Sequence, residues 1–173
     1  MKKWLCGFIV ATLLLGGWAM VQASTKSTAQ SAGAVKLMIV TAKGNIEVAI
    51  QPGLLPITCK NFLKLVDSGF YKGLKFHRVE DWVVQGGDPA GNGTGGPGWT
   101  IKLETNPKLK NIRGAIAMAR AADPDSAGSQ FYVLKTDASW LDGQYAVFGN
   151  VTKGMNVVDA LKIGDTMEIR RVK

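Results

Sequence analysis

Residues 70–88 read FYKGLKFHRVEDWVVQGGD, and this stretch decides the fold prediction. Its apolar and aromatic residues gather in two short runs, Phe76–Val79 and Trp82–Gln85, with glycine on either side. Short runs that are rich in aromatic and β-branched residues and bounded by glycine are typical of β-strands. We therefore predict two short strands here, followed by an irregular Gly/Pro loop over residues 88–98.

Further short strands are predicted on both sides of this stretch. Val35–Thr41 and Ile46–Ile50 are joined by the turn residues Lys43-Gly44-Asn45, which indicates a hairpin. The remaining predicted strands lie downstream, at Gly114–Ala119, Phe131–Leu134, Tyr145–Val151 and Met167–Val172. So many short strands favour a closed, mainly β architecture over a parallel α/β fold.

Two segments have helical periodicity instead. Apolar residues of Pro56–Val66 recur on one helical face, with Thr58 as the expected N-cap and Gly69 as the expected stop. Met155–Leu161 predicts a second short helix. The expectation is one strand-rich domain over residues 35–173 with two short helices.

The composition fits a single globular domain and limits its chemistry. The chain has 173 residues, 46% hydrophobic and 20% charged, which excludes a disordered polymer or a collagen-like repeat. Its one histidine is His77 and its two cysteines are Cys6 and Cys59, so four Cys/His zinc ligands cannot be assembled in the domain. No metal or cofactor is expected, and Cys59 is predicted to be a buried, inert thiol.

The first 23 residues are expected to lie outside the domain. Met1-Lys2-Lys3 is a basic start, residues 4–21 are almost wholly apolar, and Val21-Gln22-Ala23 offers a cleavage site, as in a secretory signal peptide. An uncleaved membrane anchor is the alternative, because residues 4–21 are long enough to span a bilayer. Residues 24–34 are small and polar and predict a flexible linker. Both alternatives place the domain outside the cytoplasm, in a periplasm or extracellular space.

Three other functional signals are weak. Gly91–Gly96 matches GxGxxG, but Pro97-Gly98 follows it instead of a helix, so a glycine-rich turn is favoured over a nucleotide loop. The formal net charge is +8, yet the lysines are spread along the chain, which predicts a solvated basic surface and no nucleic-acid partner. A Ser–His–Asp hydrolase lacks the GxSxG elbow, and its histidine would have to be His77.

Arg78 is the side chain whose position suggests a ligand. Strand alternation predicts that Phe76 and Arg78 share one face and that His77 lies on the other. An arginine among aromatic residues is costly to bury without a partner, and its guanidinium offers a fixed fork of donors for a peptide carbonyl or amide. A plain surface charge is the alternative that the residues alone leave open.

Several motifs occur together and in order: FHR at 76–78, QGGD at 85–88, MAR at 118–120, GSQFY at 128–132, WLDG at 140–143 and VFG at 147–149. This combination resembles the cyclophilin family of peptidyl-prolyl cis-trans isomerases over residues 35–173. The resemblance implies a closed eight-stranded antiparallel β-barrel capped by two short α-helices. It also implies an enzyme that accelerates rotation of X-Pro bonds in proline-containing polypeptides such as unfolded exported proteins. A non-catalytic holdase for proline-containing segments is the alternative.

The same resemblance implies a role for each matching residue. Arg78 corresponds to the catalytic arginine and Gln85 to its hydrogen-bonding neighbour. The family's pocket for the proline ring is matched by Trp82, Val83, Tyr132 and Leu141. The remaining contacts would come from Ala119 and the Arg120 backbone along the peptide groove, Gln130 at the residue before proline, Tyr145 at the pocket, and Trp140 at the ciclosporin position. His77 would be structural.

The sequence also departs from the best-known eukaryotic members. The segment between Arg78 and Gln85 is one residue shorter, and five site positions differ from the family pattern: Trp82, Val83, Arg120, Tyr132 and Tyr145 replace Phe, Met, Asn, Phe and His. These replacements keep the pocket aromatic and apolar. We expect them to change substrate preference and ciclosporin affinity more than activity.

Overall fold

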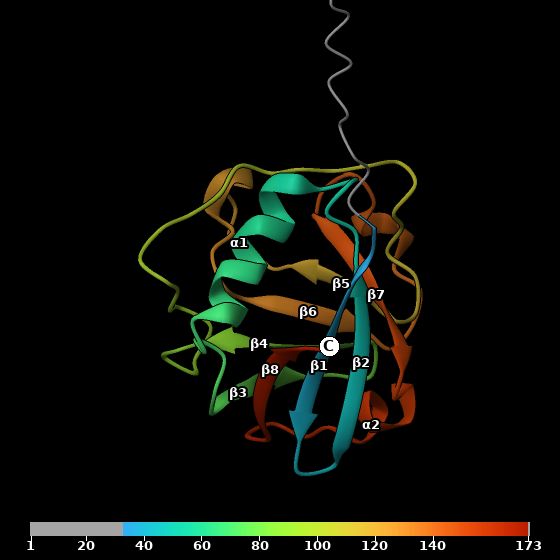
Figure 1. Cartoon of the computed structure of the whole chain (residues 1–173). Coiled ribbons are helices and arrows are strands. Elements are labelled where there is room, and N and C mark those ends of the chain that lie inside the picture. Colours follow the sequence, from blue (N-terminus) through green and yellow to red (C-terminus); the bar gives the residue numbers. More distant parts are fainter. Residues whose placement is uncertain (1–32, 173) are drawn as a thin grey trace, which may run out of the picture.

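The barrel predicted from the sequence is present in the computed structural model, which describes residues 33–172. Eight antiparallel strands close in the order β1-β2-β7-β5-β6-β4-β3-β8 (Figure 1). The strands are β1 Val35–Thr41, β2 Gly44–Ile50, β3 Leu74–Val79, β4 Val83–Asp88, β5 Ala115–Met118, β6 Phe131–Leu134, β7 Val147–Lys153 and β8 Thr166–Arg171. The predicted signal peptide and most of the predicted linker lie outside the described residues.

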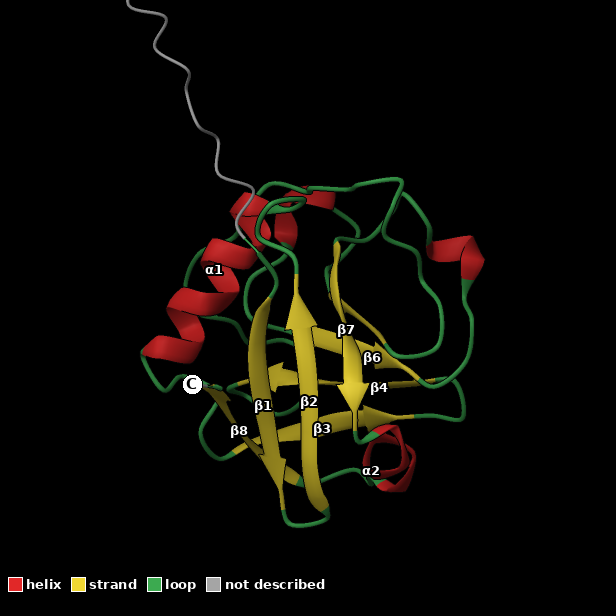
Figure 2. Ribbon diagram, turned by 45° about the vertical axis from the view of Figure 1, so that its right-hand side comes forward, coloured by secondary structure: helices red, strands yellow, loops and turns green. Residues whose placement is uncertain are grey.

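Two α-helices, α1 (Pro56–Asp67) and α2 (Met155–Ala160), lie near opposite ends of the barrel (Figure 2). Two short 3₁₀ turns, Pro124–Ser126 and Ser139–Leu141, interrupt the loops that follow β5 and β6. None of the helices within residues 33–172 has the length and apolar character needed to cross a membrane.

The start of α1 differs from the prediction. Leu55 is the N-cap residue and Pro56 occupies the first turn, where its missing N–H costs nothing and its fixed φ suits the helix. Thr58 lies inside the helix, so its prediction as N-cap was wrong. Its backbone N–H donates instead to Glu104 Oε2 at 2.7 Å, so a carboxylate from a distant loop accepts from one of the free N–H groups of the first turn.

The barrel interior is an aromatic core. Phe62 projects from α1 and its ring centroid lies 5.1 Å from Tyr71, 5.5 Å from Phe131 and 4.8 Å from Phe148. Cys59, on the same helix, is fully buried, and burial raises the pKa of its thiol to about 12. This thiol is therefore protonated and unreactive at neutral pH, as predicted.

A second apolar cluster covers the outer face of β4, β6 and β5. Along β6 the side chains alternate: Phe131 and Val133 join the interior core, whereas Tyr132 and Leu134 join the outer cluster. All four are buried, so β6 is packed on both faces. The outer cluster supplies the floor on which the candidate site is built.

Candidate active site

A small apolar pocket opens on the outer face of the β4–β6–β5 sheet. Backbone pairing places Gln85 opposite Tyr132, and Tyr132 opposite Ala117, so the sheet fixes the floor of this pocket. The pocket measures about 100 Å³. Its lining contains nine of the residues named from the sequence: Arg78, Trp82, Val83, Gln85, Ala119, Arg120, Tyr132, Leu141 and Tyr145.

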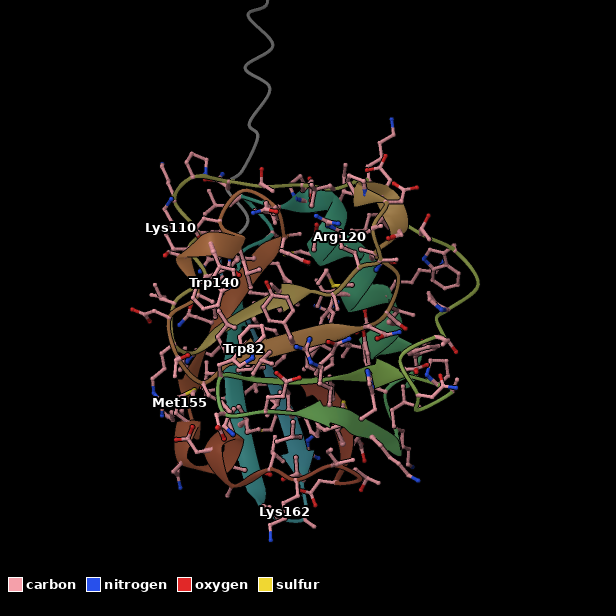
Figure 3. The ribbon with its side chains drawn as sticks, turned by 180° about the vertical axis from the view of Figure 1, so that it is seen from behind. Trp82, Lys110, Arg120, Trp140, Met155 and Lys162 are labelled. Atoms are coloured by element: carbon pink, nitrogen blue, oxygen red, sulfur yellow. The ribbon has the colours of Figure 1, made fainter. Side chains whose placement is uncertain are left out.

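The other two predicted site residues lie beside the pocket. Gln130 lines a neighbouring groove of about 520 Å³, which also contains Gln85, Ala119 and Arg120. Trp140 is 61% exposed at the rim, and its ring lies 6.0 Å from that of Trp82. Figure 3 shows Trp82 and Trp140 close together on this face, with Arg120 farther along it.

A β-bulge directs Arg78 toward the pocket. Phe76 pairs with Gly86 and Arg78 pairs with the adjacent Gln85, so His77 is an extra residue in β3. Because paired residues share a face, Phe76 points into the core and Arg78 points outward. The prediction that these two residues share a face was therefore wrong, since simple alternation does not account for an inserted residue.

Arg78 is linked to the groove through a row of side-chain amides. Its Nη1 lies 3.4 Å from Gln85 Oε1, and Gln85 Nε2 donates to Gln130 Oε1 at 2.9 Å. Gln130 Nε2 in turn donates to the carbonyls of Gly93 and Gly95, at 3.0 and 2.9 Å. These bonds fix the orientations of both side-chain amides at the border between the pocket and the groove.

The Tyr132 hydroxyl is held away from the pocket. It donates to Asn111 Oδ1 at 2.7 Å, and Asn111 Nδ2 donates to Asp142 Oδ1 at 3.0 Å. Burial raises the pKa of Tyr132, with a further rise from Tyr145 and Asp142, so the phenol stays neutral. The pocket therefore meets mainly the tyrosine ring. Asn111 was missed from the sequence because it stands in a polar loop without any motif.

Arg120 contributes its side chain as well as its backbone. The guanidinium lies 4.6 Å from the centroid of the Tyr145 ring, a cation–π geometry, and its Nε donates to the Gln144 carbonyl at 3.0 Å. Tyr145 also packs edge-on against Tyr132 at 5.9 Å. Arg120 therefore holds one wall of the pocket in place, which goes beyond the backbone role that the resemblance implied.

The glycine-rich loop after β4 is organised by a carboxylate of the protein itself. Asp88 is 1% exposed and accepts hydrogen bonds from the backbone N–H groups of Ala90, Asn92 and Gly93. Burial alone would raise the pKa of Asp88, but these three bonds outweigh it and the pKa is lowered. The GxGxxG match is thus a turn built around Asp88, as expected of a glycine-rich loop.

His77 lies partly buried beside this loop. Its Nδ1 is buried and has no hydrogen-bond partner among the described residues. Burial lowers the pKa of His77, and Arg78 lowers it further against the opposing effect of Asp88. The imidazole is therefore neutral at physiological pH. Within residues 33–172, no three His, Cys, Asp or Glu side chains are grouped to hold a metal ion.

The barrel, its two helices and the arginine-edged pocket define the cyclophilin class of fold. The comparison with family models agrees: residues 36–173 match the cyclophilin-type peptidyl-prolyl cis-trans isomerase/CLD family. The chain belongs to this family, and it is accordingly a peptidyl-prolyl cis-trans isomerase.

Named relatives support this assignment over most of the chain. A Helicobacter pylori peptidyl-prolyl cis-trans isomerase is 47% identical over 135 residues, covering 75% of this chain and 82% of the relative. Peptidyl-prolyl cis-trans isomerase A of Dickeya dadantii is 40% identical, covering 93% of this chain and 85% of the relative. Among solved structures, a cyclophilin-type isomerase of Cryptosporidium parvum, crystallised in the presence of the dipeptide Ala-Pro, has a TM-score of 0.74 at 32% identity, covering 80% of this chain and 99% of that one.

Proposed function

We propose that Arg78 accelerates X-Pro rotation by donating a hydrogen bond to the prolyl nitrogen as the amide twists. Resonance gives the X-Pro bond a rotational barrier of about 20 kcal/mol. Twisting removes the resonance and leaves a lone pair on nitrogen, which is an acceptor that the planar amide lacks. Arg78 lies at the edge of an apolar pocket of about 100 Å³, and this observation carries the proposal. Such a bond forms only in the transition state, so it lowers the barrier.

One hydrogen bond does not supply the whole acceleration. An acceleration of about 10⁶-fold requires about 8 kcal/mol, and a charge-assisted hydrogen bond contributes about 1.5–3 kcal/mol. The apolar walls disfavour the charge-separated planar amide, which destabilises the ground state. Gln85 and Gln130 are positioned to hold the carbonyl side of the bond while the proline ring stays in the pocket. In this proposal, these contributions must supply the remainder of the barrier reduction.

The substrates we propose are proline-containing segments of unfolded polypeptides. The proline ring occupies the pocket above Tyr132, and the preceding residues follow the larger groove past Ala119 and Gln130. Two observations support this placement: the pocket and the groove share Gln85, Ala119 and Arg120, and the Cryptosporidium parvum relative was crystallised in the presence of Ala-Pro.

The test is cis/trans exchange of an Ala-Pro peptide, measured by NMR exchange with full-length protein. We expect Arg78→Ala to lower kcat/KM about tenfold or more while the fold survives. Arg170→Ala is the matched control, because Arg170 is exposed on β8 and takes no part in the pocket. Near-wild-type exchange in folded Arg78→Ala would remove Arg78 from the mechanism. Peptide binding without faster exchange in the wild-type protein would favour a holdase.

We further propose that the enzyme acts outside the cytoplasm on exported chains. The basic start, the apolar residues 4–21 and the Val21-Gln22-Ala23 site support export. N-terminal sequencing of the protein from fractionated cells tests this. A soluble exported form that begins near residue 24 indicates cleavage, and an intact membrane-bound form indicates an anchor. Intact protein in the cytoplasm would refute export.

Ciclosporin is a further proposed ligand of the same face. Trp140, which corresponds to the family's ciclosporin tryptophan, is exposed beside the pocket and packs against Trp82. We expect ciclosporin to compete with an Ala-Pro peptide and to lose affinity in Trp140→Ala. An unchanged peptide affinity at saturating ciclosporin would contradict this.

A further inference from the structure

The short connection between β3 and β4 places a carboxylate between two residues of the site. Glu80 Oε1 accepts a hydrogen bond from Arg78 Nε at 2.7 Å, and Glu80 Oε2 accepts one from the Trp82 indole Nε1, also at 2.7 Å. Arg78 and Trp82 thus share one carboxylate. The Arg78 guanidinium also lies 5.2 Å from the centroid of the Trp82 ring. The three residues form one hydrogen-bonded unit at the edge of the pocket.

The backbone of this unit is fixed from two directions. Glu80 N–H donates to the Val83 carbonyl at 2.8 Å, which closes the turn between the strands. Lys135, which follows β6, donates from Nζ to the Glu80 carbonyl at 2.9 Å and from its backbone N–H to the Trp82 carbonyl at 2.8 Å. Glu80 is therefore held relative to both the hairpin and the sheet that carries Tyr132.

Each hydrogen bond to Glu80 has a consequence for the pocket. Because the Nε–H of Arg78 is bonded to Glu80, the guanidinium is oriented with Nη1 toward Gln85, which leaves Nη2 for a ligand. The bond from Trp82 fixes the indole, which forms a wall of the pocket. The orientations of the arginine and of the wall are therefore coupled through one carboxylate.

The arrangement contributes little to stability. The Arg78 and Glu80 side chains are 41% and 45% exposed, and exposed ion pairs are worth about 0–1 kcal/mol. The arrangement instead affects the geometry of the site, where small displacements of a catalytic group strongly reduce the reaction rate.

We propose that Glu80 is a positioning residue of the isomerase, which uses its two carboxylate oxygens to hold Arg78 and Trp82 in register around the proline. This inference rests on the proposed role of Arg78. It assigns a role to a residue in the connection between β3 and β4 that is not itself among the residues that line the pocket.

Glu80→Gln tests the inference with little change in shape. An amide has one acceptor oxygen, and its NH₂ group would face the second donor, so one of the two bonds is lost. We expect kcat/KM for an Ala-Pro peptide to fall about fivefold, mainly in kcat, with unchanged thermal unfolding. Asp81→Asn is the matched control, because Asp81 is the adjacent exposed carboxylate. NMR resonances of the Arg78 Nε–H and the Trp82 indole N–H should shift in Glu80→Gln and stay in place in Asp81→Asn.

The double variant separates a positioning role from a direct one. If Glu80 acts mainly through Arg78, Glu80→Gln lowers kcat less in an Arg78→Ala background than in the wild type, and any effect that remains reports on Trp82. Slow exchange in Arg78→Ala together with normal rates in Glu80→Gln would overturn this inference and leave the role of Arg78 intact. Normal exchange in Arg78→Ala would overturn both. A rise in kcat in Glu80→Gln would show that the carboxylate restrains Arg78, which also contradicts the proposal.

Discussion

The two faces of β6 are both buried, but only the outer face borders a pocket. On the inner face, Phe131 packs edge-on against Phe62 and Tyr71, with ring centroids 5.5 and 5.7 Å away. On the outer face, Tyr132 is 5% exposed and still borders a pocket of about 100 Å³. One short strand therefore supplies both the core and the floor of the site. The floor of the site is buried almost as deeply as the core, whereas Trp140 at its rim is 61% exposed.

The largest expected effect is on the inner face. Phe131→Ala should lower the free energy of unfolding by about 3–5 kcal/mol, because it removes a fully buried ring from the aromatic core. Denaturant unfolding measures this change. The activity of the folded fraction should fall far less than in Arg78→Ala. A small loss of stability with a large loss of activity would reverse the comparison between the two faces.

The outer face should show a smaller effect on stability. Tyr132→Phe removes the hydroxyl that donates to Asn111, a residue that is 1% exposed, and leaves the Asn111 acceptor without this partner. We expect a loss of about 1–3 kcal/mol in denaturant unfolding. Since the hydroxyl points away from the pocket, Ala-Pro exchange at matched folded concentration should be retained. A large change in kcat would show that the hydroxyl reaches the substrate.

The stability that the Asp88 loop contributes to the fold should depend on pH. The fold lowers the pKa of this carboxyl below its ordinary value of 3.8, so its stabilisation is present above that value and is lost as pH falls through the folded pKa. Denaturant midpoints of wild type and Asp88→Asn should differ near neutral pH and converge at acid pH. The other carboxylates are the same in both proteins, so their contributions to the pH dependence cancel in the difference between the two midpoints. Parallel curves at every pH would contradict this assignment.

The smallest effect is expected from the row of amides. Gln130→Ala removes the bonds from Gln130 to Gln85, Gly93 and Gly95, but leaves both faces of β6 packed. Stability should change little, and kcat/KM should fall about threefold as Gln85 loses its fixed orientation. Asn150→Ala, an exposed amide on β7, is a suitable control. A stability loss as large as that of Tyr132→Phe would show that Gln130 mainly stabilises the fold, which contradicts this prediction.

Strand and helix positions could be predicted because local pattern determines them. The hairpin of β1 and β2, the alternation along β6 and the periodicity of α1 are all visible over short windows of sequence. The pocket residues could be named because their motifs occur together in the family's order, even though the segment between Arg78 and Gln85 departs from the expected length. Nine of them line one cavity.

The features that were missed depend on contacts between distant or irregular segments. The bulge at His77 places Phe76 and Arg78 on opposite faces of the sheet, and nothing in the sequence of β3 marks an inserted residue. Glu104 satisfies the N-terminus of α1 from a distant loop, which made Thr58 unnecessary as a cap. Asn111 likewise reaches Tyr132 only through the folded chain. The sequence of the connection between β3 and β4 does not show that Glu80 bridges Arg78 and Trp82, because both bonds depend on the folded turn.

Closure of the barrel has a consequence for how the protein meets its substrates. Each of the eight strands has a hydrogen-bonded neighbour on both sides, so the described sheet has no edge strand, although β3 pairs with β8 only through Leu74 and Lys75. An unfolded chain carries free backbone donors and acceptors, and an open edge would let it add as a further strand regardless of sequence. Because the barrel has no edge strand, it offers little opportunity for a chain to add as a further strand. We therefore expect a polypeptide to bind through the proline pocket and the neighbouring groove, and not as a further strand of the sheet.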